Sequence, residues 1–269
     1  MKKFPARLHV LLARDAKTAV VFRRGPSKST CSVLWNRKTD EFKTGQWLRG
    51  RIYERRSDIS PDGKFLIYFA MNGKWESETK GAWTAISKAP WLKALALFGK
   101  GDCWHGGGLF TSEKNYWLND GYGHQTIRNS SSVRRDEKFR PKEYYGGECL
   151  GVYFVRLQRD GWELKTDLSE TTTFEKPLSH GWRLRKHAHA DLGHPPGKGC
   201  YWDEHELQAD DGQRIDGSKW EWADVDGKKL VWAEAGCLFR STIKKSGMGE
   251  RKLLYDFNEM KFKAIPAPY

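Results

Sequence analysis

The sequence has few cysteines, and their spacing forms no recognisable motif. Five cysteines in 269 residues is an odd number, and no two are separated by only two residues. The odd number and this spacing argue against a disulfide framework or a zinc ribbon and favour reduced thiols. No apolar run approaches the length of a membrane span, and the run that follows the N-terminal Met-Lys-Lys-Phe-Pro is too short for a signal peptide. We therefore expect a cytoplasmic protein.

The common short catalytic motifs are also missing. The chain contains no GxxxxGK[ST] phosphate loop, no GxSxG elbow and no HExxH helix. The glycine run 106–108 lacks the strand-to-helix context of a phosphate cradle. We expect no cofactor, and a protein without enzymatic activity is favoured over an enzyme.

Positive charge is abundant. Forty-seven Lys and Arg residues against 34 Asp and Glu give a formal net charge of +13. An excess of this kind predicts an acidic partner, which would be another protein with an acidic surface or a nucleic acid. The alternative is that the charge serves only solubility, and the oligomeric state is left open.

Aromatic residues and a repeated pattern indicate a β protein. Thirteen Trp, thirteen Phe and ten Tyr suit half-buried strands. Acidic turn residues at positions 15, 62, 113, 160 and 226 are separated by 47, 51, 47 and 66 residues, close to the length of a four-stranded propeller blade. Each is flanked by two apolar runs, which predicts a hairpin. The five predicted hairpins span 8–22, 57–69, 108–118, 151–164 and 220–233.

Two of these segments show a family resemblance. Ser60-Pro61-Asp62-Gly63-Lys64-Phe65-Leu66-Ile67-Tyr68 resembles the blade signature of the PD40, or TolB-like, β-propeller repeat, which is similar to WD40 blades, and residues 225–232 are a weaker copy. Residues 50–56 and 83–87 also resemble a family of uncharacterised bacterial proteins. The resemblance implies a fold and no reaction.

The predicted fold is therefore all-β, a single β-propeller domain of about five four-stranded blades. The alternative is a β-sandwich or barrel with evenly spaced hairpins. A C-terminal strand at 253–262 is expected to pack against the N-terminal strands and close the ring. The approximate blades are 6–50, 51–102, 103–147, 148–190 and 215–265, with an insertion at 187–214 between the fourth and fifth.

Candidate binding residues are arginines interleaved with aromatic side chains. Side chains two apart on a strand share a face, so each of two segments would present several together. Guanidinium groups suit phosphate or carboxylate, although an arginine can also simply pack its stem on a tryptophan. The predicted polyanion- or partner-binding residues are Trp47, Arg49, Arg51, Tyr53 and Arg55, and Trp182, Arg183 and Arg185.

Two further patterns could support enzyme chemistry. His187, His189 and His194 are weak candidates for metal ligands, although their spacing follows no zinc template and they are equally consistent with a surface loop. No catalytic residue is predicted. Asp58, Asp203 and Asp224 are weak candidates for the paired carboxylates of glycoside hydrolysis. Cys103 and His105 could form a nucleophile pair on one strand face, or could simply pack.

These observations rank three functions. The favoured prediction is a non-enzymatic propeller that acts as an interaction scaffold for another protein. The alternative is a protein that binds nucleic acid or another polyanion through a basic face, and the third is a hydrolase or metal-dependent enzyme at the channel mouth.

Overall fold

The computed structural model describes residues 4–25, 28–121, 123–145, 149–168, 170–191, 193 and 199–269. Within these ranges the strands form five sheets of three to five strands. The predicted all-β class is therefore confirmed. The chain divides into two compact units, one made mainly of residues 10–156 and 260–269, and the other of residues 5–9 and 157–259. Each unit is described by itself.

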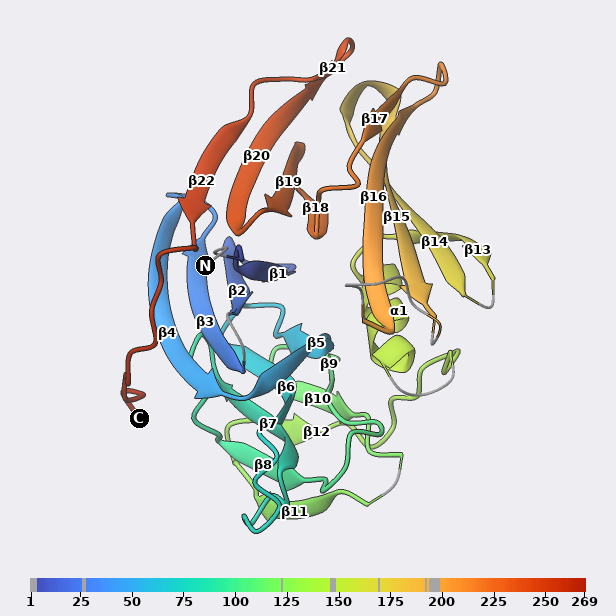
Figure 1. The fold of residues 1–269 in the computed structure, drawn as a ribbon. Helices are drawn as coiled ribbons and strands as arrows, with labels where there is room; N and C mark the ends of the chain where they lie inside the picture. The colour runs from blue at the N-terminus through green and yellow to red at the C-terminus, as the bar shows by residue number, and fades with distance from the viewer. Residues whose placement is uncertain are drawn as a thin grey trace. The chain divides into compact units, whose positions relative to one another are not determined.

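The strands of the first sheet lie side by side in chain order (Figure 1). β2 and β3 pair antiparallel, and β3 pairs with β4 so that Trp35 lies opposite Phe42 and their rings stack at 5.8 Å. The neighbouring strands β1 and β2 confirm the hairpin predicted at 8–22. The strands are β1 (Arg7–Leu12), β2 (Thr18–Arg24), β3 (Ser29–Asn36) and β4 (Glu41–Arg49).

The second sheet contains the Ser-Pro-Asp-Gly turn. Ser60 Oγ accepts a hydrogen bond from the Phe65 amide at 2.9 Å, and Asp62 Oδ1 accepts one from the Lys64 amide at 3.1 Å. Gly63 has φ +74°, the left-handed conformation that such a turn requires. The hairpin predicted at 57–69 is therefore confirmed. The strands are β5 (Arg51–Ile59), β6 (Phe65–Met71), β7 (Ala82–Lys88), β8 (Ala96–Gly99) and β11 (Gln125–Arg128).

β6 is buried on both of its faces. Leu66 and Tyr68 join a hydrophobic cluster with Phe22 of the first sheet. Ile67, which points the opposite way, joins a second cluster with Phe110 of the third sheet. The second sheet is thus packed between the first and the third. The third sheet consists of β9 (Gly108–Phe110), β10 (Asn115–Leu118) and β12 (Arg134–Arg135), and its β9–β10 hairpin is the one predicted at 108–118.

A helix replaces the hairpin predicted at 151–164. α1 (Cys149–Arg159) ends in a Schellman motif, in which the Trp162 amide bonds to the Leu157 carbonyl at 3.0 Å and the Gly161 amide bonds to the Gln158 carbonyl at 3.2 Å. Gly161, with φ +89°, therefore ends a helix and does not form a hairpin turn. No helix in the described ranges is long and apolar enough to cross a membrane.

The fourth sheet contains the stretch that the sequence predicts to be an insertion. β15 and β16 pair antiparallel from Trp182 opposite Ala209 to Ala190 opposite Tyr201, so residues 187–214 supply much of this pairing. Buried Trp182, Leu184 and Ala188 alternate with polar side chains along β15. The strands are β13 (Glu163–Asp167), β14 (Thr171–Pro177), β15 (Trp182–Ala190), β16 (Tyr201–Ala209) and β17 (Arg214–Asp216), and the short 3-10 turn η1 (Ser179–Gly181) precedes β15.

The fifth sheet contains the second Asp-Gly turn. Asp226 pairs with Lys229 across a two-residue turn, which confirms the hairpin predicted at 220–233. The C-terminal strand ends at Asp256 and pairs with β20, so the expected pairing with the N-terminal strands is wrong. Directly after it, the Phe257 amide bonds to the Gly236 carbonyl at 2.9 Å. The strands are β18 (Trp222–Asp226), β19 (Lys229–Glu234), β20 (Cys237–Lys244), β21 (Gly247–Met248) and β22 (Lys252–Asp256).

Candidate functional site

Exposed cations lie over aromatic rings where β4 ends and β5 begins. The Arg49 guanidinium carbon is 4.8 Å from the ring centre of Phe262, and that of Arg51 is 4.5 Å from the ring centre of Tyr53. Trp47 packs on the other side of this site, with its ring centre 5.9 Å from that of Phe262. The structure thus brings four of the predicted residues to one corner of the first unit, together with a phenylalanine that the sequence analysis did not include.

The C-terminal segment extends this arrangement along β4. Gln46 Nε2 donates a hydrogen bond to the Ile265 carbonyl at 2.8 Å, while Gln46 Oε1 accepts one from the Leu92 amide at 2.7 Å. Gln46 therefore joins the segment 260–269 to the loop after β7. Two more cations lie over rings near this joint, namely Lys43 at 5.9 Å from Trp91 and Lys88 at 5.0 Å from Tyr269.

In the described part of the chain, these four cations have no carboxylate partner. Lys43, Arg49, Arg51 and Lys88 are exposed, and within the described ranges none of them forms an ion pair. Each ring attracts the cation above it but leaves its positive charge uncompensated. We call Lys43, Arg49, Arg51 and Lys88 the cation–ring surface.

Arg55, the remaining residue of this predicted segment, is not part of the cation–ring surface. It is only 7% exposed, and its guanidinium carbon lies 4.6 Å from the ring centre of Tyr153 on α1. Its neighbour Arg56 is also buried, and its Nε donates to Cys149 Sγ at 2.9 Å. These two arginines hold the helix and are not available on the surface.

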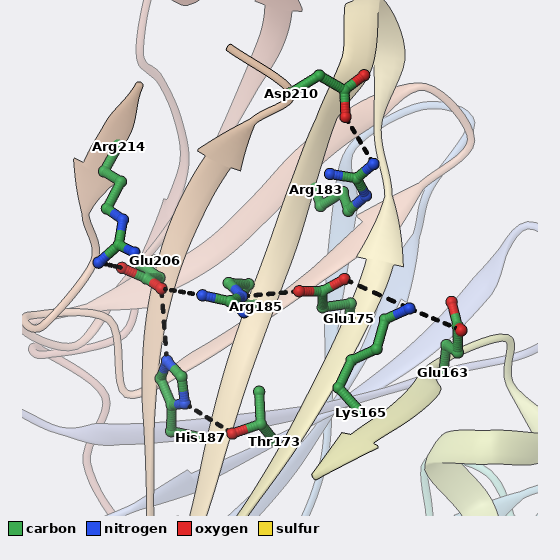
Figure 2. A network of polar contacts seen from close by, with 10 residues as sticks. All are labelled: Glu163, Lys165, Thr173, Glu175, Arg183, Arg185, His187, Glu206, Asp210 and Arg214. Carbon is green, nitrogen blue, oxygen red and sulfur yellow. Dashed lines mark hydrogen bonds and ion pairs between the residues drawn. The ribbon is translucent and has the colours of Figure 1, made fainter. Parts of the chain in front are cut away.

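The second predicted basic segment is neutralised by its own sheet. Figure 2 shows Arg185 on β15 between Glu175 on β14 and Glu206 on β16, with nitrogen–oxygen distances of 2.8 Å and 3.1 Å. Burial alone would lower the pKa of Arg185, but the hydrogen bonds to the two glutamates outweigh this and raise it. Arg183 pairs with Asp210 at 2.5 Å.

Trp182 completes this segment and is only 2% exposed. The structure therefore does not bring Trp182, Arg183 and Arg185 together as a free basic face. Their role in partner binding stays a prediction.

The two described histidines of the predicted metal site bond to their own sheet. His187 Nδ1 lies 3.1 Å from Thr173 Oγ1 and its Nε2 lies 3.6 Å from Glu206 (Figure 2). His189 Nδ1 lies 2.9 Å from Thr171 Oγ1, and its ring stacks on Trp202 at 4.6 Å. No group of three or more possible metal ligands gathers in the described part of the chain. His194 lies outside the described residues.

Asp203, one of the carboxylate candidates, lies in a buried charged cluster on the opposite face of the fourth sheet, together with Lys186, which the sequence analysis did not include. Lys186 Nζ donates to His205 Nε2 at 2.9 Å and lies 3.7 Å from Asp203, while His205 Nδ1 lies 2.9 Å from the Trp220 carbonyl. Burial, and then the charge of Lys186, lower the pKa of His205 to about 3. His205 is therefore neutral, and its Nδ1–H donates to the carbonyl.

The other catalytic candidates have structural partners. Asp58 is 1% exposed and accepts a hydrogen bond from the Phe110 amide at 2.7 Å, and Asp224 pairs with Lys176 at 2.8 Å. The carbonyls of Cys103 and His105 both accept hydrogen bonds from Arg56, so this peptide holds the arginine in place.

Comparison with known proteins yields distant structural likenesses. No family model matches the chain, and no curated protein matches it. One similar solved structure is an uncharacterized protein of Listeria monocytogenes EGD-e, at 10% identity and TM-score 0.32 over 94% of this chain. The chain spans 66% of that protein, slightly less than two thirds of its length. Another is the GH93 alpha-L-arabinofuranosidase of Fusarium graminearum in complex with arabinobiose, at 11% identity and TM-score 0.24, covering 97% of this chain and 84% of that one.

These findings correct the favoured function. The prediction of a non-enzymatic scaffold is wrong, since no comparison supports a scaffold role and one of the similar structures is an enzyme. Neither likeness assigns an activity or a substrate to this chain. The PD40 signature remains a resemblance at the level of the blade turn, since no family model matches.

Proposed function

We propose that the first unit binds a nucleic acid, or another flexible polymer of phosphates, at the cation–ring surface. The observation that supports this is the state of Lys43, Arg49, Arg51 and Lys88. All four are exposed, three lie 4.5–5.0 Å and one 5.9 Å from a ring centre, and none forms an ion pair within the described ranges. A cation that is held in place yet unpaired is available to a phosphate.

The rings limit what kind of recognition is possible. In each contact the protein's own cation lies over the ring, so the ring face beneath it is not a free platform on which a base can stack. We therefore expect contacts to phosphate oxygens, without preference for sequence. Such binding weakens steeply with salt, because each neutralised phosphate releases counterions.

The contrast with the fourth sheet argues against a general effect of charge. Arg183 and Arg185 belong to an equally basic sequence, but carboxylates of neighbouring strands neutralise them. If the net charge of +13 alone caused binding, both basic segments would be expected to bind equally. We assign binding to the segment that contains Arg49 and Arg51.

Charge reversal at two positions tests this assignment. The double variant Arg49→Glu, Arg51→Glu should lose retention on a column of immobilised single-stranded DNA at low salt. The matched control is Arg128→Glu, Arg134→Glu, which changes the net charge equally on exposed residues of the same unit. Equal loss in both variants would show that net charge alone governs retention and would contradict the site.

We further propose that the five sheets are blades of one β-propeller. Support comes from the chain-order pairing of the strands in the first sheet and from β6, whose two faces pack against different sheets. A single propeller domain should unfold in one cooperative calorimetric transition. Two separated transitions in the full chain would contradict it.

A further inference from the structure

A polar cavity of about 210 Å³ lies in the first unit, beside the ends of β10 and β12. It is distinct from the cation–ring surface and contains none of its four cations. A cavity of this volume takes a ligand smaller than a typical drug. Residues that define it include His105, Trp117, Asp120, Arg135, Glu137 and Arg140.

One guanidinium organises two carboxylates at this cavity. Arg135 Nη2 lies 2.6 Å from Asp120 Oδ2, and its Nε lies 3.3 Å from Glu137 Oε1. Each carboxylate thus gives one oxygen to Arg135 and keeps its second oxygen as an acceptor. Arg135 thus brings the two carboxylates to the same cavity, with Asp120 in the shorter contact and Glu137, whose side chain is 72% exposed, in the longer one.

Aromatic side chains supply the less polar walls. Trp117 is 7% exposed and is fixed by Phe139, with ring centres 5.9 Å apart. Tyr144 is 47% exposed. The His105 ring lies directly on Gly121, since a Cβ added there would be 2.7 Å from three ring atoms.

The backbone of His105 is itself unusual. Its φ is +56°, in the left-handed region that non-glycine residues rarely adopt. Strained residues of this kind concentrate at ligand sites, where the surrounding structure holds them.

The charges of the lining nearly cancel. Asp120, Asp136 and Glu137 face Arg135 and Arg140. Both oxygens of Asp136 already accept hydrogen bonds within the protein. Its Oδ2 accepts one from Thr111 Oγ1 at 2.7 Å, and its Oδ1 accepts from two backbone amides. Arg135 is bonded to Asp120 and Glu137, and Arg140 Nη1 donates to the Glu137 and Phe139 carbonyls at 2.7 and 2.8 Å. What remains for a ligand is one oxygen on each of the two carboxylates, the Nε and Nη2 groups of Arg140, and the aromatic faces, with little net charge.

We propose that this cavity binds a neutral polyhydroxylated ligand the size of one sugar ring. Each hydroxyl both donates and accepts, so it can serve the free carboxylate oxygens and the Arg140 guanidinium at once. The C–H face of a sugar ring suits the aromatic walls. A free anion would lie beside Asp120 and Glu137, and a simple amine would compete with Arg135 for the same two carboxylates.

The test uses the full chain and known probes. Isothermal titration calorimetry with ligand at millimolar concentration would compare a panel of neutral pentoses and hexoses with inorganic phosphate and ethanolamine. We expect binding of at least one sugar and of neither ion. Absence of sugar binding, or binding of only phosphate or only ethanolamine, would overturn the proposal.

Variants then locate the binding. Glu137→Gln removes a charged acceptor from an exposed side chain, and it should weaken sugar binding by about tenfold or more. Tyr144→Ala should also weaken it. The control Arg134→Ala changes the adjacent strand residue, which is absent from the cavity lining, and should leave binding unchanged. Equal affinity in Glu137→Gln, Tyr144→Ala and the control would place the sugar elsewhere. DNA retention should be unaffected by all three changes, so failure of this proposal is separable from failure of the cation–ring surface.

Discussion

Arg49, at the end of β4, lies with its guanidinium carbon 4.8 Å from the ring centre of Phe262, which is 213 residues further along the chain. The contact is doubly supported, because Trp47 packs against the same phenylalanine ring. A side chain that is normally mobile in solvent is thus held in one place. A segment distant in sequence therefore positions an arginine that no carboxylate within the described ranges neutralises.

Removing that ring should weaken binding without removing charge. Phe262→Ala leaves Arg49 charged but mobile, so polyanion affinity should fall about two- to fivefold, in line with an exposed cation–π contact of about 0.5–1 kcal/mol. The measurement is fluorescence anisotropy with a labelled single-stranded oligonucleotide. Phe4→Ala, which changes another exposed phenylalanine, is the control and should have no effect. Unchanged affinity in Phe262→Ala would show that the ring does not support Arg49.

The paired arginine of the fourth sheet should behave in the opposite way. Arg185→Gln leaves Glu175 and Glu206 without their shared partner, so the free energy of unfolding should fall by about 2 kcal/mol, while DNA binding stays the same. Arg214→Gln is the control, because Arg214 is 62% exposed and 4.0 Å from Glu206, and should cost less than about 0.5 kcal/mol. Chemical denaturation measures both. A loss of DNA binding in Arg185→Gln would show that the DNA-binding site lies on this sheet.

The two Asp-Gly turns should differ in their tolerance of a side chain. Gly63 and Gly227 both have positive φ, at +74° and +63°, so alanine costs about 1–2 kcal/mol at each. A Cβ at Gly63 would also meet Thr18 Cβ at 2.8 Å, whereas nothing lies within 4 Å at Gly227. Gly63→Ala should therefore lower the melting temperature more than Gly227→Ala does. Equal shifts would show that Thr18 moves aside freely.

Stability should fall as the pH is lowered through the range in which unfolded histidine titrates. The pKa of His205 is lowered from 6.5 to about 3 in the folded protein. Between these pH values the unfolded chain therefore binds a proton at this histidine and the folded chain does not. Its contribution is complete above about pH 6.5 and is lost progressively as the pH falls toward 3, by at most about 1.4 kcal/mol per pH unit.

A variant isolates this contribution. His205→Gln can keep a donor and an acceptor, and it should make the stability curve flatter between pH 6.5 and 4.5 even if the variant is less stable overall. His124, whose pKa burial lowers to about 4, is the second histidine expected to contribute, so His124→Gln serves as a comparison. Parallel curves for wild type and His205→Gln would contradict a neutral buried His205.

The sequence predicts local features of this fold better than non-local ones. The turns at Asp62 and Asp226 follow from neighbouring residues and are present. The helix at Cys149–Arg159 could have been found, because four of its buried apolar residues, at 149, 152, 153 and 157, recur at helical spacing. The Asp-Gly pair at 160–161 instead suggested a hairpin, since the same glycine conformation serves a turn and a helix end.

β16 was missed for a different reason. Tyr201–Ala209 contains Asp203, Glu204, His205 and Glu206, a composition that indicates a solvated loop. Two of these side chains are nevertheless buried, because Lys186 on the paired strand offsets their polarity. The same strand supplies Glu206, which neutralises Arg185, so the sequence could not distinguish the paired basic segment from the unpaired one.

The most direct test of the cation–ring surface is the salt dependence of its affinity for a single-stranded oligonucleotide of mixed sequence. If all four cations contact phosphates, the logarithm of the binding constant should fall with the logarithm of salt with a slope near −3, at about −0.7 for each phosphate. Arg49→Ala, Arg51→Ala should make that slope shallower by about 1.4. A wild-type slope near zero, or an unchanged slope in the double variant, would contradict the account.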